Sequence, residues 1–158
     1  MVKYEPYKTM DLDETEKELD TRISSDEMIA VALKTTGKLI GNLYLGKREF
    51  EALEIGYVFN RQYWGHGNAK ESCEAVIQKA FSEGTHRIFA ECDPQNENLW
   101  RLLESLGFIK EAHFQRNVYF WKDDDGKPVW KDTFVYSLLN ERTALSSDMK
   151  IKKIGRNL

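Results

Sequence analysis

The sequence predicts an α+β fold: a mixed, mostly antiparallel sheet flanked by helices. Apolar, β-prone runs follow one another through short polar links, as in antiparallel hairpins, at 28–34, 39–45 and 51–59. Apolar residues recur at helical spacing over 69–81 and 99–106, and the β-prone run 86–92 lies between them. Hairpins at both ends and one crossover in the middle indicate a layered fold with a mixed sheet rather than a doubly wound one.

A further helix is predicted near the start of the chain, at about 11–24. Asp11 and Glu14 have the spacing of a capping box, which satisfies free N–H groups at a helix start. Three apolar residues of this acidic segment are expected to face inward: Leu12, Leu19 and Ile23.

The end of the fold is predicted to be a long hairpin. An aromatic-rich strand at 108–121 is followed by an acidic turn at 123–127 and a return strand at 129–139. The Asp-Asp-Asp-Gly run in the turn lacks the later ligands of an EF-hand, so a hairpin turn is the better interpretation than a calcium site.

Length and composition indicate one globular domain, residues 1–142, followed by a basic tail, residues 143–158. The chain has 158 residues, of which 41% are hydrophobic, and this content suits a packed core rather than disorder. A net charge of −3 gives no overall attraction to nucleic acid or anionic membrane. The longest apolar run, 28–33, is far below the roughly 18 residues of a membrane span, and no secretory leader is evident. We therefore expect a cytoplasmic protein.

Cysteine usage gives no sign of a disulfide framework or a metal site. Cys73 and Cys92 are the only cysteines, and they are widely spaced. Reduced thiols in the core are expected, and no metal is expected.

The segment Gln62–Ala69 carries the clearest chemical signal. Gly65 and Gly67 precede a predicted helix start, where free N–H groups and the helix dipole favour a phosphate. Glycines let the backbone approach such a group, and Lys70 adds a cation. A Walker loop is absent, the dinucleotide fingerprint lacks its third glycine, and a plain glycine turn remains the alternative.

Three motifs of the sequence occur together in one known family. The first, Gln62-x-x-Gly65-x-Gly67, is similar to the acyl-coenzyme-A motif of the GNAT superfamily of N-acetyltransferases. The segment around it looks like the branch typified by ribosomal-protein alanine N-acetyltransferases. The run from Asn96 to Phe108 resembles that branch's N-x-x-S-x-x-x-L-E-K-x-G-F block. The closing hairpin places Arg116, Trp130, Asp132 and Tyr136 as in the family. The resemblance covers about residues 27–140, in the same order as the predicted elements.

The resemblance implies a binding site for acetyl-coenzyme A (acetyl-CoA) in which two central strands splay apart. The implied cofactor-binding residues are Tyr57, Val58 and Phe59 along the pantetheine arm, Gln62 in the motif, Gly65, His66, Gly67, Asn68, Ala69 and Lys70 at the pyrophosphate, and Asn96 beside the pantetheine. The alternative role for Asn96 is a helix N-cap.

The resemblance also implies a catalytic problem. The family serine is Leu99 here, and the place of a tyrosine general acid is Leu103. The attacking amine must lose a proton, and our first choice of base is Glu54. The other options are Glu91, Tyr119, His113 and His86. A backbone N–H near Val58 or Phe59 is expected to stabilise the oxyanion.

The expected function is transfer of acetyl from acetyl-CoA to a primary amine, either a peptide N-terminus or a small amine, by direct attack in a ternary complex. The alternative is a catalytically inactive acyl-CoA-binding sensor or scaffold, which the two leucines favour. A dinucleotide-binding protein is disfavoured by the hairpin topology. Relatives generally begin with an additional strand and a helix before the matched region. The tail, with its partly alternating run 150–154, is therefore expected to supply a strand to a vacant edge, within the chain or in a homodimer. The alternative is a disordered tail.

Overall fold

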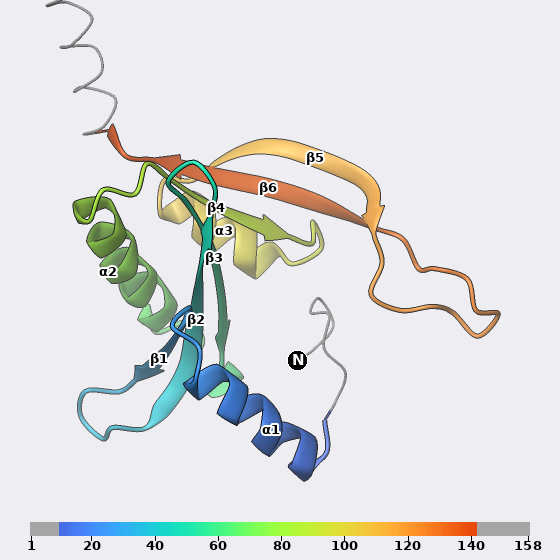
Figure 1. The fold of residues 1–158 in the computed structure, drawn as a ribbon, viewed down its shortest axis with the longest axis horizontal. Coiled ribbons are helices and arrows are strands. Elements are labelled where there is room, and N and C mark those ends of the chain that lie inside the picture. Colours follow the sequence, from blue (N-terminus) through green and yellow to red (C-terminus); the bar gives the residue numbers. More distant parts are fainter. Residues whose placement is uncertain (1–9, 142–158) are drawn as a thin grey trace, which may run out of the picture.

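The computed structural model describes residues 10–141, so the expected tail, residues 143–158, lies outside the described residues. Its sheet has six strands in the order β1-β2-β3-β4-β6-β5 (Figure 1). The strands are β1 (Met28–Ala32), β2 (Leu39–Arg48), β3 (Ala52–Phe59), β4 (Arg87–Cys92), β5 (Ile109–Val118) and β6 (Lys131–Leu139). The helices are α1 (Leu12–Ile23), α2 (Asn68–Ser82) and α3 (Glu97–Ser105). All strand pairs are antiparallel except β3–β4, so the predicted α+β fold with a mixed, mostly antiparallel sheet is confirmed.

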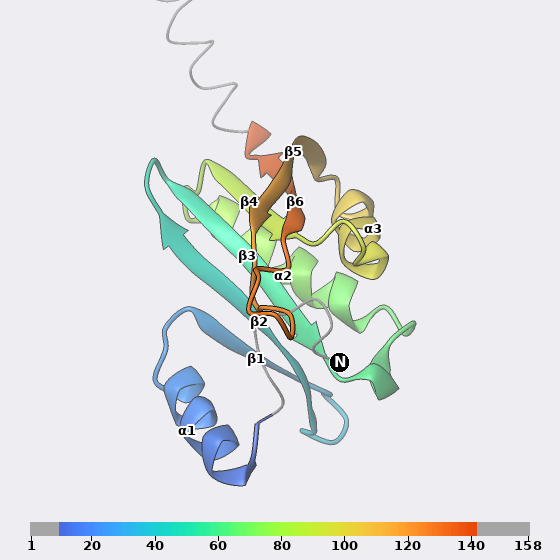
Figure 2. The same ribbon diagram turned by 90° about the vertical axis from the view of Figure 1, so that its right-hand side faces the viewer.

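The main core lies between the sheet and the pair α2 and α3. Figure 2 shows these two helices on one side of the sheet and α1 on the other. Side chains alternate between the two faces of a strand, and one face of β3 and β4 supplies apolar residues to this core. The most deeply buried large side chains are Leu43, Cys73, Ile88, Leu103 and Tyr136. Removing this packing would expose apolar surface, at a cost of about 25 cal/mol per Å².

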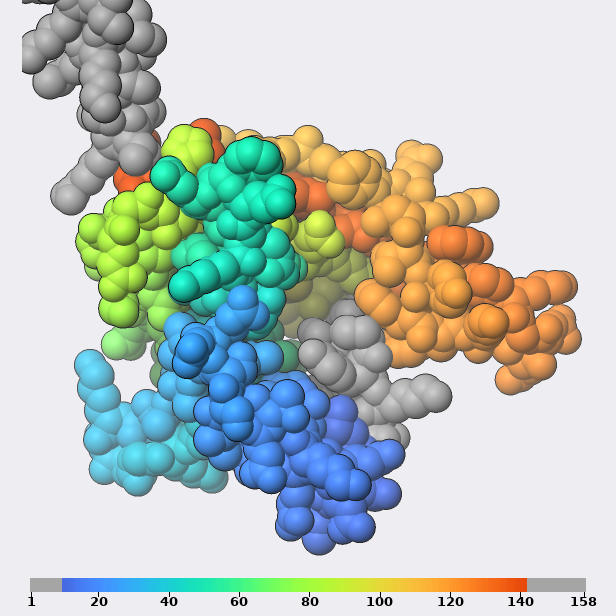
Figure 3. Space-filling model, in the orientation of Figure 1, coloured from blue at the N-terminus to red at the C-terminus, as the bar shows by residue number. Residues whose placement is uncertain are grey.

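Helix α1 begins as predicted but packs differently. The Glu14 N–H donates to Asp11 Oδ1 at 2.9 Å and the Asp11 N–H donates to Glu14 Oε2 at 3.1 Å, which confirms the capping box. The inward orientation expected for its apolar residues is wrong, because Leu12 is 74% exposed and Ile23 is 73% exposed. Leu19 is exposed as well. In Figure 3 the helix accordingly lies on the outside of the molecule.

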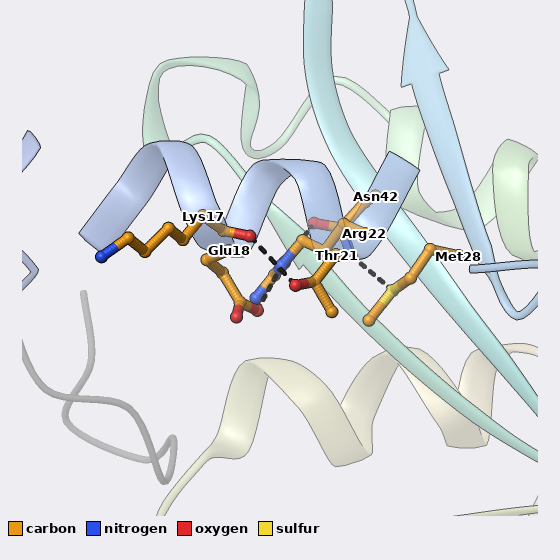
Figure 4. Close-up of polar contacts among 6 residues, drawn as sticks. All are labelled: Lys17, Glu18, Thr21, Arg22, Met28 and Asn42. Carbon is orange, nitrogen blue, oxygen red and sulfur yellow. Dashed lines mark hydrogen bonds and ion pairs between the residues drawn. The ribbon is translucent and has the colours of Figure 1, made fainter. Parts of the chain in front are cut away.

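Polar side chains connect α1 to the sheet instead (Figure 4). Arg22 forms an ion pair with Glu18 at 2.8 Å and donates to Asn42 Oδ1 on β2 at 3.2 Å. The Asn42 amide then approaches the sulfur of Met28 on β1 at 3.8 Å. The helix is therefore oriented by directional contacts, which periodicity of apolar residues does not reveal.

The closing hairpin differs from its predicted bounds. Strand β5 ends at Val118 rather than 121, after a register shift between Phe114 and Val118. Arg116 lies in this shift with φ +48°, a conformation that interrupts regular pairing. The acidic turn is present, since Asp123 Oδ1 accepts the N–H groups of Asp125 and Lys127 at 3.0 and 2.9 Å.

Membrane-spanning helices and metal-binding clusters are both absent from residues 10–141. None of the helices there is both long enough and apolar enough to cross a bilayer. No group of three or more His, Cys, Asp or Glu side chains in that range is arranged to hold a metal ion.

Candidate active site

A cavity of about 890 Å³, which we call the large cavity, lies where β3 ends and α2 begins. Its walls come from the end of β3, the loop that follows, the first turn of α2 and the start of α3. The lining residues are Tyr57, Val58, Phe59, Arg61, Tyr63, Trp64, Gly65, Gly67, Asn68, Ala69, Lys70, Asn96, Asn98, Leu99 and Leu102.

The large cavity forms because β3 and β4 diverge. Their parallel pairing runs only from Ala52–Arg87 to Glu54–Phe89, whereas β4 continues to pair with β6 as far as Cys92. The second half of β3 therefore has no partner strand on that side. This is the splaying of central strands that the family resemblance implies.

Backbone groups of β3 face the resulting gap. The Glu51 carbonyl accepts the N–H of His86 at 2.9 Å, so it faces β4. Backbone groups alternate in direction along a strand, so those of Tyr57 and Phe59 face the gap while those of Val58 face β2. Of the two N–H groups expected for an oxyanion, that of Phe59 remains the candidate.

The loop after β3 is shaped by its own hydrogen bonds. The indole N–H of Trp64 donates to the Phe59 carbonyl at 2.8 Å. Gly65 has φ +76° and Gly67 has φ +79°, and a Cβ at either position would meet no atom within 4 Å. The glycines are therefore required by backbone conformation and not by close contact.

The start of α2 presents unsatisfied N–H groups to the large cavity. Gly67 is the N-cap and supplies no side-chain bond, and the first helical bond runs from the Glu71 N–H to the Gly67 carbonyl at 3.0 Å. The N–H groups of the preceding residues, 68–70, therefore have no acceptor within the helix. Together with the helix dipole, they form a site suited to a phosphate or pyrophosphate.

Most of the predicted cofactor-binding residues meet at this cavity. The structure places Tyr57, Val58, Phe59, Gly65, Gly67, Asn68, Ala69, Lys70 and Asn96 in its lining. Gln62 and His66 are exposed and absent from it. The Gln62 N–H donates to Asn60 Oδ1 at 3.0 Å, and the His66 ring bonds the Trp64 carbonyl at 2.8 Å, so local turn bonds orient both residues.

Sequence reasoning missed several lining residues, of which Arg61 is the most informative. Its guanidinium has no hydrogen bond or ion pair to another residue within 10–141, and it lies beside the glycine loop. A free cation there complements a phosphate-binding helix start. The signal in the sequence that could have indicated Arg61 is its position as a basic residue just before the glycine motif.

Asn96 is at the N-cap position of α3 but does not cap it. Its side chain makes no capping bond, and no hydrogen bond joins it to another described residue. The amide is half-buried and lines the large cavity. Asn96 thus holds the N-cap position expected as its alternative role but lacks the side-chain bond of a cap, so the amide remains available for a ligand.

A small cavity of about 460 Å³ adjoins the large one, and both are lined by Asn96 and Leu99. The other lining residues of the small cavity are Glu54, Glu91, Cys92, Asp93, Asn117, Val118, Phe120, Lys131, Asp132 and Thr133. Carboxylates outnumber cations in this lining. Two molecules bound in the two cavities would therefore meet beside Asn96 and Leu99.

The two carboxylates expected as candidate bases have different surroundings. Glu54 forms an ion pair with Arg48, which is also bonded to the Tyr44 hydroxyl at 3.0 Å. The Glu91 carboxylate has no hydrogen bond or ion pair to another residue within 10–141. Burial raises the pKa of Glu91, the charge of Glu54 raises it further, and Arg48 opposes both. A carboxylate with a raised pKa and free oxygens is the better proton acceptor, so the geometry favours Glu91 over Glu54.

The remaining base options line neither cavity. The ring of His113 bonds Asp132 Oδ2 at 2.7 Å, and Tyr119 packs edge-on against Trp130. His86 precedes β4 and contributes its N–H to the sheet. Asp132 does line the small cavity, and hydrogen bonds from the Arg116 N–H and His113 hold its pKa below the usual range.

The two leucines at the family's hydroxyl positions have different environments. Leu99 is half-buried and lines both cavities, whereas Leu103 is fully buried in the core. Neither side chain can donate a proton. The Tyr57 hydroxyl, however, donates to the Leu99 carbonyl at 3.1 Å, which places a hydroxyl next to this wall.

Neither cysteine is suited to be a nucleophile. Cys73 and Cys92 are buried and free, as predicted. Burial raises the pKa of each thiol to about 12, with Glu74 and Asp93 respectively as further causes. A thiol needs to ionise to attack, so Cys92 stays inert although it lines the small cavity.

Comparison with known proteins identifies the family. The acetyltransferase (GNAT) domain profile matches residues 1–109. The uncharacterized N-acetyltransferase YnaD of Bacillus subtilis is 31% identical over 120 residues, which are 73% of this chain and 65% of YnaD. YjcK of the same organism is 33% identical over 78% of this chain and 68% of its own length. The chain thus spans about two thirds of these relatives, and it belongs to the GNAT acetyltransferase family.

Solved structures agree with this assignment. A GNAT-family acetyltransferase from Bacillus anthracis superimposes with a TM-score of 0.78 at 29% identity, covering 89% of this chain and 81% of that protein. A Vibrio cholerae spermidine N-acetyltransferase in complex with CoA and spermine gives 0.70 at 18% identity, over 89% and 82% of the two chains. A ribosomal-protein-S5-alanine acetyltransferase from Vibrio fischeri gives 0.69 at 23% identity, over 87% and 78%. The latter two likenesses show the fold alone.

Proposed function

We propose that the protein is an N-acetyltransferase that moves the acetyl group of acetyl-CoA to a primary amine. The observation that carries the proposal is the junction of the two cavities at Asn96 and Leu99. The large cavity offers an open helix start and an unpaired strand edge to acetyl-CoA, and the small cavity offers carboxylates to an amine. Bringing both substrates together in this way supplies much of the rate of a bimolecular reaction.

Direct attack of the amine is the proposed mechanism. Glu91 accepts the proton of the attacking amine, and the Phe59 N–H faces the developing oxyanion. The ion pair of Glu54 with Arg48 supplies the neighbouring charges that influence the pKa of Glu91. Since the thiol of Cys92 remains protonated, no acetyl-enzyme intermediate is formed on it.

The proposed acceptor is a small amine that carries a second positive charge. Glu54 is paired with Arg48, and Asp93 is paired with Lys131. Glu91 and Asp132 are left without a lysine or arginine partner among the described side chains and are at the same cavity. A cavity in which carboxylates outnumber lysines and arginines raises the local concentration of cations. The spermine named for the Vibrio cholerae neighbour is an amine of this kind.

The remaining acceptor class is a peptide N-terminus, which the sequence resemblance to ribosomal-protein alanine N-acetyltransferases suggests. Such an acceptor has one ammonium group and a peptide chain. An amine panel therefore separates the two classes, provided that it includes diamines, monoamines of matched length and short peptides.

Two measurements test the function. Calorimetric titration with CoA and acetyl-CoA is expected to give one site per chain. Release of the CoA thiol from acetyl-CoA is then followed with the amine panel, and diamines are expected to react fastest. Binding without thiol release from any amine would support the alternative, an acyl-CoA-binding sensor or scaffold, which Leu99 and Leu103 favour. Absence of binding to either ligand would contradict both proposals.

A further inference from the structure

We propose that the Tyr57 hydroxyl stabilises the departing CoA thiolate by donating a hydrogen bond to it. This inference depends on the proposed transfer of acetyl from acetyl-CoA. It assigns a catalytic role to a residue of the cofactor strand that the sequence indicated only as a neighbour of the pantetheine arm.

The position of the reaction follows from the two cavities. An amine from the small cavity and a thioester from the large cavity meet at the residues common to both linings, Asn96 and Leu99. The C–S bond that breaks must therefore lie beside these residues. Any group that interacts with the sulfur must reach the same wall.

Few side chains at this wall can donate a hydrogen bond to sulfur. The Tyr57 hydroxyl is 3.1 Å from the Leu99 carbonyl, and Tyr57 itself lines the large cavity. The Leu99 side chain has no donor. The Lys131 ammonium is paired with Asp93 and lines only the small cavity, on the side of the amine. The Asn96 amide is a neutral donor at this wall. Of the ionisable donors that line the large cavity, Tyr57 is the one whose hydroxyl contacts the Leu99 carbonyl.

The chemical state of Tyr57 fits a hydrogen-bond donor better than a proton-transferring acid. Burial raises the pKa of this phenol well above its usual range, and Cys73 and Cys92 add smaller effects in the same direction. An alkyl thiol such as free cysteine has a pKa of about 8.5, so full transfer of the phenolic proton to sulfur would be uphill. The O–H bond therefore stays intact while the hydroxyl interacts with the charged sulfur.

The electrons and protons of the step balance. The amine nitrogen forms the new bond to the carbonyl carbon, and Glu91 takes the amine proton. The electron pair of the C–S bond moves to sulfur, and the thiolate leaves as an anion that takes a proton from water. Before reaction the Tyr57 hydroxyl donates to a neutral carbonyl, and a charged acceptor forms a bond about twice as strong. The interaction is therefore stronger in the transition state than in the ground state.

The pKa of the CoA thiol bound to the protein tests this role directly. Thiolate absorbance of the stoichiometric CoA complex is followed through a pH titration, for the natural protein and for Tyr57→Phe. The protein's own thiols, Cys73 and Cys92, have pKa values raised to about 12, above the range in which the bound thiol titrates. The bound thiol is expected to have a pKa below that of free CoA in the natural protein and about one unit higher in Tyr57→Phe. The same variant is expected to lose about tenfold in kcat, with KM for acetyl-CoA little changed.

Tyr136→Phe is the matched control. Its buried hydroxyl donates to Glu104 on α3 at 3.0 Å, and the residue lines neither cavity. Like Tyr57→Phe, this variant loses a phenolic oxygen and one hydrogen bond to α3. It is expected to change neither the pKa of the bound CoA thiol nor kcat. Thermal unfolding of both variants checks that each remains folded.

Three outcomes overturn the inference. The first is that the thiol pKa of bound CoA is the same in Tyr57→Phe as in the natural protein. The second is that this pKa rises in Lys131→Met and not in Tyr57→Phe. The third is that CoA bound to the natural protein has the thiol pKa of free CoA. In each case the natural protein still binds CoA and transfers acetyl, so the proposed function stands. A natural protein that binds no CoA contradicts the proposed function itself.

Discussion

The guanidinium of Arg48 is bonded to the carboxylate of Glu54, and this pair separates the roles of Glu54 and Glu91, the two glutamates of the small cavity. Glu54 is occupied by its partner. Glu91 has free oxygens within the described part of the chain and a pKa raised by burial and by the charge of Glu54. The pair thus keeps one carboxylate charged beside another that is suited to exchange a proton.

Replacing Glu91 with glutamine is expected to lower kcat by about 100-fold, because general-base catalysis contributes at least that much. KM for acetyl-CoA should change little, since Glu91 does not line the large cavity. Steady-state kinetics with the best amine of the panel measures both. Glu54→Gln is the matched control, and a greater loss of kcat in that variant than in Glu91→Gln would show that Glu54 is the base.

The acid limb of the pH–rate profile is expected to move in opposite directions in two variants. Activity falls as pH drops through the pKa of the base, because the protonated carboxyl cannot accept a proton. Arg48 lowers the pKa of Glu91 and Glu54 raises it. Arg48→Met should therefore move the limb of kcat/KM to higher pH, and Glu54→Gln should move it to lower pH. Shifts of the same sign in both variants would assign the limb to another group.

Gly67→Ala is expected to weaken CoA binding much more than it weakens the fold. Gly67 has φ +79°, and a methyl group added there would meet no atom within 4 Å, so the cost to stability is backbone strain of about 1–2 kcal/mol. Any relaxation of that strain moves the N–H groups of the first turn of α2. Gly126→Ala is a matched control, because Gly126 has φ +78° and equally open space but lies in the turn of the β5–β6 hairpin. Calorimetry should show reduced CoA affinity in the first variant alone.

The β2–β3 turn is expected to be a site where stability can be gained. Phe50 and Glu51 have φ values of +59° and +56°, which suit asparagine and glycine better than these residues. Phe50 is 89% exposed, so its replacement removes no packing. Phe50→Asn combined with Glu51→Gly should raise the free energy of unfolding by about 1–2 kcal/mol. Urea unfolding measures it, and a lower midpoint with an unchanged slope would contradict this explanation.

Local chemistry explains what the sequence can predict. The capping box of Asp11 and Glu14 and the glycines at 65 and 67 depend on neighbours within a few residues, and the structure has both features. The orientation predicted for α1 is wrong, because Arg22 and Asn42 connect the helix to the sheet across 20 residues of chain. Apolar periodicity contains no signal for such a contact.

The acidic side of the candidate site is only partly predictable for a similar reason. The sequence indicates Glu54 and Glu91 as options, but their order depends on Arg48, which reaches Glu54 through the register of a hairpin. Asp132 comes to the same cavity from a strand far along the chain. The backbone of Gln62 and the ring of His66 are held by turn hydrogen bonds that the motif does not encode. Tertiary contacts therefore decide which carboxylate is the better base and which side chains line the site, and the motif alone does not encode these contacts.

The stability of the fold is expected to decrease in acid through Glu111. Hydrogen bonds from Arg87 and then Ser137 lower the pKa of Glu111 to about 2, whereas an unfolded glutamate titrates at about 4.3. The unfolded chain therefore binds more protons between these values, so this contribution is complete above the unfolded pKa and is lost as pH falls toward 2. The Glu111 side chain is 40% exposed, so solvent screening limits the contribution to about 1 kcal/mol or less. Unfolding of Glu111→Gln should depend less on pH in this window than that of the natural protein. An identical pH dependence would assign the acid sensitivity to other carboxylates.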